Sequence, residues 1–112
     1  PGSPEALLGT WQLVEILADP GDGSGTYTPV DSNKMIVFDN NGRFSSNGAI
    51  CSFAAAVNEN VEGTYEIFSN TEFRINCAEE NLDYVALFLE NQVLIVNYPC
   101  IEPCSNKYIK ID

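Results

Sequence analysis

Residues 34–46 read KMIVFDNNGRFSS, and this stretch decides the fold. Two short runs of β-forming residues, 34–38 and 43–46, flank the turn sequence DNNG at 39–42. Asn-Gly between such runs is the strongest short-range signal for a β-hairpin, because both residues tolerate the positive φ angles of a tight turn. The stretch therefore predicts two antiparallel strands joined by a short turn.

The same pattern continues in both directions along the chain, with a turn signal at intervals of about 8 to 12 residues. The other expected strands are 9–17, 27–30, 63–68, 72–76, 82–89, 92–98 and 107–111. Nearly every connection is short, which favours pairing between strands that are neighbours in sequence. We therefore predict an all-β domain, a small antiparallel up-and-down barrel of eight to nine short strands.

Two segments fall outside this pattern. Residues 1–6 are expected to be a flexible lead-in to a single domain formed by residues 7–112. Residues 49–57 (AICSFAAAV) are ambiguous. Their alanines favour a short helical turn near 52–57, although the surrounding residues show no sustained helical spacing.

The composition excludes several classes of protein. The 112 residues are enough for one core, and 45% of them are apolar, as in an ordinary globular domain. The 16 acidic and 5 basic residues give a net charge of -11, which disfavours nucleic acids and anionic membranes and otherwise indicates solubility. No apolar run reaches the roughly 18 residues of a membrane-spanning helix.

The four cysteines indicate the compartment. An even number in a small domain predicts two disulfides in an extracytoplasmic protein, either periplasmic, at the cell surface or secreted, with a lipid anchor upstream as one option. Free thiols and a zinc site are the alternatives, and the absence of histidine disfavours zinc. Cys100 and Cys104 lie in one loop between two expected paired strands, which leaves Cys51 to pair with Cys77.

No residue pattern indicates catalysis. The commonest general base, histidine, is missing, and no serine lies in a Gly-x-Ser-x-Gly elbow. The acids Glu79 and Glu80 fall in an expected turn and are expected to be solvated. Asp19, Asp22 and Ser24 lie in a glycine-rich loop without the spacing of a calcium site. We expect a non-enzymatic protein with no cofactor and no metal.

Glu15 and a set of aromatic residues are the candidate ligand contacts. Strict alternation places Glu15 on the same face of the first expected strand as Trp11 and Leu13. If that face is the lumen, the Glu15 carboxylate is buried and requires a partner. Arg43, Arg74, a tyrosine hydroxyl or the amine of a ligand would serve, and solvent exposure is the alternative. The candidate ligand contacts are Glu15, Phe44, Tyr65, Phe73, Tyr84 and Phe88, with Phe53 in the same aromatic set. These rings would either line an apolar pocket or fill the barrel completely.

The tripeptide Gly9-Thr10-Trp11 is a Gly-x-Trp motif near the start of the first expected strand. On this motif and the order of strands, the chain resembles the lipocalin-like families of the calycin group, especially the short lipocalin-like domains of bacterial envelope proteins. The resemblance implies that a basic residue of the last strand packs over Trp11 and closes the barrel, a contact worth roughly 0.5–2 kcal/mol. Lys107 is the preferred candidate, and Lys110 is the other.

Two classes of function follow. The first is a monomeric ligand-binding module that holds a small apolar or amphipathic molecule at the barrel mouth. The alternative is a protein-interaction barrel with a filled interior, in line with a weaker similarity to small secreted barrels that inhibit proteases. An open apolar cavity would favour the first class, and a filled interior with an exposed apolar patch would favour the second. A structural envelope protein with neither property is the third option.

Overall fold

The computed structural model describes residues 5–18, 26–39, 41–48, 50, 60–76, 84–98 and 104–112. These ranges contain the strands β1 (Gly9–Ala18), β2 (Tyr27–Pro29), β3 (Met35–Phe38), β4 (Arg43–Ser46), β5 (Val61–Ile67), β6 (Glu72–Asn76), β7 (Tyr84–Glu90), β8 (Val93–Tyr98) and β9 (Cys104–Lys110). All nine expected strands are confirmed, each within three residues at either end. The helical turn expected near 52–57 lies outside the described residues.

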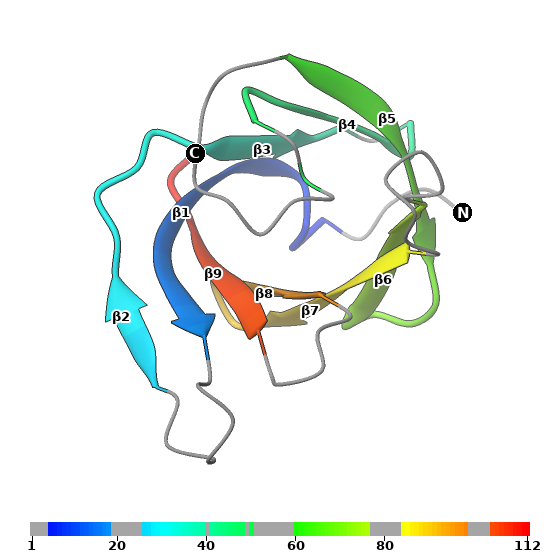
Figure 1. Ribbon diagram of the computed structural model, residues 1–112. Helices are drawn as coiled ribbons and strands as arrows, with labels where there is room; N and C mark the ends of the chain where they lie inside the picture. Colours follow the sequence, from blue (N-terminus) through cyan, green and yellow to red (C-terminus); the bar gives the residue numbers. More distant parts are fainter. Residues whose placement is uncertain are drawn as a thin grey trace.

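The strands form a closed antiparallel barrel, and Figure 1 looks along it. From β3 to β9 each strand pairs with the next one in sequence, and β9 then pairs with β1. Because β1 also pairs with β3, eight strands close the ring, while β2 is an extra strand beside the second half of β1. The predicted all-β up-and-down barrel is therefore confirmed.

Strand β1 contains a β-bulge that reverses its two faces. Its register against β9 shifts between Leu13 and Glu15. One extra residue in a strand exchanges its inward and outward positions from that point on. Strict alternation after Trp11 and Leu13 would point Glu15 inward, but after the bulge Ile16 points inward instead. Ile16 accordingly packs against the buried core, opposite Asn106 of β9.

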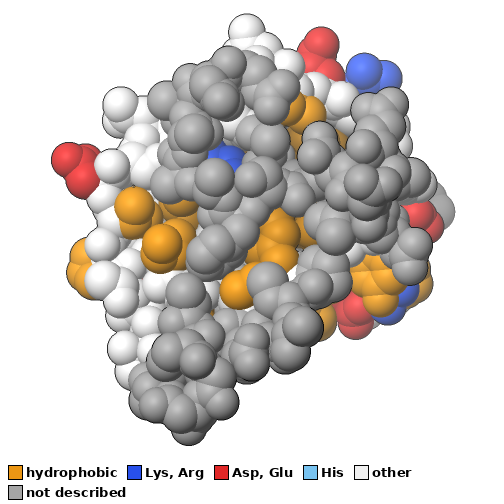
Figure 2. All heavy atoms as spheres, in the orientation of Figure 1, with side chains coloured by type: hydrophobic (Ala, Val, Ile, Leu, Met, Phe, Trp, Pro, Cys, Tyr) orange, Lys and Arg blue, Asp and Glu red, His pale blue; other side chains and the backbone are white. Residues whose placement is uncertain are grey.

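The described residues pack large side chains into the barrel interior. Inward and outward positions alternate along most strands, as in β7, where Val85, Leu87 and Leu89 are buried and their neighbours are more accessible. The ring of Tyr65 packs edge-to-face against Phe38 and Phe73, with centroid distances of 5.3 and 6.3 Å. Figure 2 shows hydrophobic side chains gathered at the centre of the ring of strands.

One end of the barrel is closed around Trp11. The indole nitrogen of Trp11 donates a hydrogen bond of 2.9 Å to the carbonyl oxygen of Leu7, and both side chains are fully buried. At the same end the Thr10 amide donates to the carbonyl oxygen of Asp112 at 3.1 Å. Gly9 has a φ of +123°, and a Cβ atom there would lie 2.3 Å from that oxygen of Asp112. The glycine of the Gly-x-Trp motif is therefore required by both conformation and space.

Candidate functional site

The aromatic residues expected to contact a ligand fall into two groups. Phe44, Tyr65 and Phe73 point into the barrel and expose only 6%, 6% and 0% of their surface. A cavity large enough for a ligand would leave the side chains that line it accessible to water-sized molecules. The near-complete burial of these rings therefore makes them packing residues of a filled interior.

Tyr84 and Phe88 belong to the second group and lie on the outer wall. They occupy the outward positions of β7 and remain 41% and 38% exposed. The sequence did not distinguish the two faces of β7, because both carry apolar residues. Phe53, the acids Glu79 and Glu80, and the loop residues Asp19, Asp22 and Ser24 lie outside the described residues.

Glu15 and Lys107 both lie on the outer wall. The bulge in β1 turns Glu15 outward, where its carboxylate forms an ion pair of 3.0 Å with the Lys107 ammonium. Lys107 packs over the ring of Tyr27, 4.3 Å from its centroid. Glu15 therefore does not take the lumenal position that was considered for it, and the expectation that Lys107 covers Trp11 is wrong. The residue of β9 directly opposite Trp11 is the second candidate, Lys110.

Several polar side chains that the sequence did not single out are buried in the barrel. The Tyr98 hydroxyl donates to the carbonyl oxygen of Ile50 at 2.8 Å and accepts a bond of 3.3 Å from the Asn106 amide. The Tyr108 hydroxyl is buried and forms no hydrogen bond with the described residues, although the Asn106 side chain lies near enough to affect its pKa. Burial raises the pKa of both tyrosines. The nearby Tyr108 raises the pKa of Tyr98 further. The Asn106 side chain has a smaller, opposite effect and lowers the pKa of both hydroxyl groups.

Lys34 is a fully buried lysine just before β3. Desolvation lowers the pKa of its ammonium group to about 8, because burial disfavours the charged form. The backbone carbonyl of Lys34 accepts a hydrogen bond of 3.0 Å from the Leu13 amide. Lys34 thus belongs to the packed wall of the barrel near Leu13.

The outer wall of β6 and β7 carries a cluster that we call the outer aromatic patch, formed by Phe68, Arg74, Tyr84 and Phe88. The Arg74 guanidinium lies 3.9 Å from the ring centroid of Phe68 and 4.4 Å from that of Tyr84. It also forms an ion pair of 3.2 Å with Glu72, which lies opposite Phe88 in the sheet. On the side of β6, Figure 2 shows hydrophobic side chains beside acidic and basic ones.

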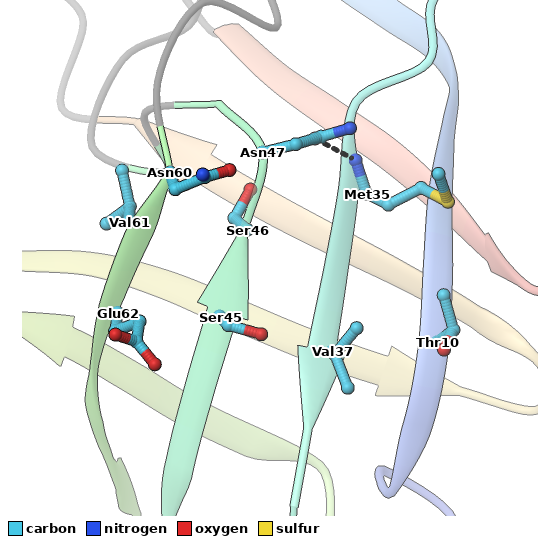
Figure 3. Close-up of a pocket in the computed structure, with 9 residues that line it drawn as sticks. All are labelled: Thr10, Met35, Val37, Ser45, Ser46, Asn47, Asn60, Val61 and Glu62. Atoms are coloured by element: carbon cyan, nitrogen blue, oxygen red, sulfur yellow. Dashed lines mark hydrogen bonds between the residues drawn. The ribbon is translucent and has the colours of Figure 1, made fainter.

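A second surface feature lies on the outer wall of β1, β3, β4 and β5. It is a hollow of about 480 Å³, and Figure 3 shows the residues that line it. Val37 contributes an exposed apolar side chain, and Glu62 contributes a carboxylate. Neither this hollow nor the outer aromatic patch could be located from the sequence, because both depend on how distant strands align.

Only Cys104, of the four cysteines, lies in the part of the chain that the structure describes. Its side chain is 9% exposed at the start of β9, and its Sγ atom is 3.8 Å from the carbonyl oxygen of Tyr98. Because Cys51, Cys77 and Cys100 lie outside the described residues, both expected disulfide pairings stay predictions.

The described ranges contain no group of three or more potential metal-ligating side chains. They also contain no helix long and apolar enough to cross a membrane. In comparisons with known proteins, no family model matches the chain and no curated protein matches it.

Proposed function

We propose that this domain is a non-enzymatic binding module that recognises a protein partner through the outer aromatic patch. The observation that carries the proposal is the cluster itself: Phe68, Tyr84 and Phe88 remain 51%, 41% and 38% exposed around a fixed Arg74. The closed barrel acts as a rigid scaffold that presents this surface. The filled interior supports this reading over a ligand held in the lumen.

The chemistry of the patch suits protein recognition. Aromatic residues and arginine are enriched in the energetically important centres of protein interfaces. Two rings and Glu72 already hold the Arg74 guanidinium in place, so a partner would immobilise little additional side-chain freedom. The partner would meet a strongly acidic protein with a net charge of -11, which favours a basic rim on the partner surface.

Recognition by strand addition is less well supported. β2 lies outside the closed ring, and its outer edge is the place where an added strand would pair. The Val30 amide points to β1, where it donates a hydrogen bond to the Val14 carbonyl oxygen. Because successive backbone amides point to opposite sides of a strand, the nitrogen of the preceding residue, Pro29, faces the open edge. Proline has no amide hydrogen to offer there, which protects the edge from another strand.

A binding comparison tests the proposal. The immobilised domain would be exposed to the extracytoplasmic fraction of the organism that produces it, beside a Tyr84→Ser/Phe88→Ser variant and an Ile111→Ser control. Ile111 is also exposed, at 47%, but lies after β9. A protein retained by the wild type and the control, lost with the double variant and weakened by salt, is the expected result. Equal retention by all three chains would contradict the role of the patch.

The alternative, a small ligand at the barrel mouth, has its own test. Native mass spectrometry of the purified domain would reveal a small molecule bound at one copy per chain. Such a molecule, released by organic solvent and restored by adding it back, would favour the ligand-binding alternative. If no bound small molecule is found, the binding comparison decides between the protein-recognition and ligand-binding functions.

We also propose that the domain is a lipocalin-like protein of an extracytoplasmic compartment. The Gly-x-Trp motif at the start of β1 and the position of Lys110 opposite Trp11 support the lipocalin-like assignment. The compartment follows from the expected disulfides. Peptide mapping without reduction should find Cys100 joined to Cys104 and Cys51 joined to Cys77. Full alkylation of all four thiols in native protein would remove the argument for this compartment.

A further inference from the structure

The hollow on the outer wall of β1, β3, β4 and β5 has the dimensions of a small-ligand site. Its volume of about 480 Å³ is within the range of roughly 300–1,000 Å³ that is usual for such sites. The hollow is on a different group of strands from the outer aromatic patch. An inference about it is therefore independent of the function proposed above.

The floor of the hollow is one row of four side chains, one from each of four neighbouring strands. The pairing places Thr10 beside Val37, Val37 beside Ser45, and Ser45 beside Glu62. Figure 3 shows these four side chains next to one another, with Met35 further along β3. The row changes from apolar at Val37 to hydroxyl at Ser45 and carboxylate at Glu62.

The upper part of the hollow has a fixed wall. The Asn47 side chain accepts a hydrogen bond of 2.8 Å from the Met35 amide and donates one of 2.7 Å to the carbonyl oxygen of Asn33. Its amide is thus engaged in holding the end of β4 against β3. Ser46 and Val61 also line the hollow, so it extends to the end of the β4–β5 pair.

Charge and shape limit the ligand class. Among the nine described residues that line the hollow, Glu62 is the one that carries a charge, and its carboxylate forms no ion pair with any described residue. Together with a net charge of -11, this disfavours anions. None of the nine described lining residues has an aromatic ring on which a sugar could stack.

We propose that this hollow binds a small amphipathic cation, a primary ammonium group carried on a short aliphatic chain. The ammonium group would lie at the Glu62 carboxylate and the Ser45 hydroxyl, and the aliphatic chain would cover Val37 and Met35. A free alkylamine and the lysine side chain of a peptide share this chemistry. Arg43, the next outward residue of β4 before Ser45, is the basic group that would compete with the ligand.

Nuclear magnetic resonance titration of the full chain tests the proposal. The probes are n-hexylammonium, hexanoate and hexanol at constant ionic strength, with N-acetyl-lysine methylamide as the peptide-like cation. The expected result is saturable shifts of the Thr10, Val37, Ser45 and Glu62 amide signals with the two cations only. Tighter binding of the lysine derivative would identify a peptide side chain as the source, and tighter binding of hexylammonium would identify a free amine.

Two substitutions and a matched control complete the test. Glu62→Gln should weaken cation binding roughly two- to fivefold, the range of a partly solvated ion pair, and Val37→Lys should abolish it by placing an ammonium group in the hollow. Glu66→Gln removes another exposed acid from β5 and should leave binding unchanged. The proposal is overturned if hexanoate or hexanol binds equally well, if the shifts map elsewhere or do not saturate, or if Glu62→Gln and Glu66→Gln behave alike.

Discussion

The Glu15 carboxylate and the Lys107 ammonium lie 3.0 Å apart on the outer wall, where β1 and β9 run side by side. The same ammonium group packs over the Tyr27 ring, and the Tyr27 and Ser105 hydroxyls are 2.8 Å apart. These contacts fasten the extra strand β2 to the closed barrel. Side-chain contacts on the surface thus add to the main-chain pairing between β1 and β2 in holding β2 against the barrel.

Substitution of Lys107 should loosen β2 without unfolding the barrel. Lys107→Met removes a partly exposed ion pair and a cation–π contact, so we expect a loss of about 0.5–1.5 kcal/mol in the free energy of unfolding. Hydrogen exchange of the Val30 amide, which is bonded to Val14 of β1, should accelerate more than exchange of the β7 amides. A double-mutant cycle with Glu15→Gln measures the coupling, and strictly additive effects would show that the ion pair contributes nothing.

Gly9 should be among the least tolerant positions of the barrel. Gly9→Ala forces an L-residue to a φ of +123° and places its Cβ atom 2.3 Å from the Asp112 carbonyl oxygen, so we expect a loss of about 2–4 kcal/mol. Gly42→Ala is the matched control, because its φ is also positive, at +76°, but no atom lies within 4 Å. Its expected cost is about 1 kcal/mol. Urea unfolding that found equal costs would refute the steric argument.

The strands were predictable because their signals are local. Alternating residues mark each strand and turn residues mark its ends, and the antiparallel pairing of β3 with β4 was correctly predicted. The faces of the strands were less predictable. The bulge between Leu13 and Glu15 has no compositional mark, and it moves Glu15 from the inner face that strict alternation would give it to the outer wall. β7 carries apolar residues on both faces, so alternation could not separate Phe88 from Leu87.

The surface features depend on register between strands that are distant in sequence. The row from Thr10 to Glu62 exists only because three separate pairings align. The outer aromatic patch similarly brings both Phe68 and Tyr84 against the Arg74 guanidinium. A single sequence contains no local signal for such alignments. The start of β9 was also missed by three residues, because Cys104, Ser105 and Asn106 are all buried and do not alternate.

The buried ionisable groups predict how the stability of the fold depends on pH. Between about pH 8 and 10.5 Lys34 is largely neutral in the folded protein but protonated in the unfolded chain, so the free energy of unfolding should rise with pH. The whole shift corresponds to a gain on the order of 3 kcal/mol. Above pH 10 the unfolded chain loses tyrosine protons that Tyr98 and Tyr108 keep when folded, so stability should fall again.

Urea unfolding at a series of pH values from neutral to strongly alkaline measures this dependence. Lys34→Met should remove the rise above pH 8 and keep the later fall, because only the lysine contribution is lost. A Lys107→Met control should retain both parts of the profile. A wild-type stability that declines steadily from pH 8 onward would contradict the burial of Lys34 as an ionisable group.

The two buried tyrosines of the barrel should respond in opposite ways to loss of their hydroxyl groups. The Tyr98 hydroxyl bonds to the Ile50 carbonyl oxygen and to Asn106, whereas the buried Tyr108 hydroxyl forms no hydrogen bond with any residue that the structure describes. Tyr98→Phe leaves buried polar groups unsatisfied and should cost about 1–3 kcal/mol. Tyr108→Phe removes a buried hydroxyl that forms no hydrogen bond within the described ranges, so the stability of this variant should be unchanged or higher by about 1 kcal/mol.

Both phenylalanine variants keep the ring and therefore the packing, so the comparison isolates the hydroxyl groups. The free energy of unfolding in urea gives the stabilities, and the tyrosine absorbance titration of Tyr108→Phe gives a second readout. Because Tyr108 contributes to the raised pKa of Tyr98, the Tyr98 pKa should move downward in that variant. Equal destabilisation by the two substitutions would mean that the Tyr108 hydroxyl forms a hydrogen bond in the folded protein, and Asn106, which already lowers the Tyr108 pKa, would be the candidate partner.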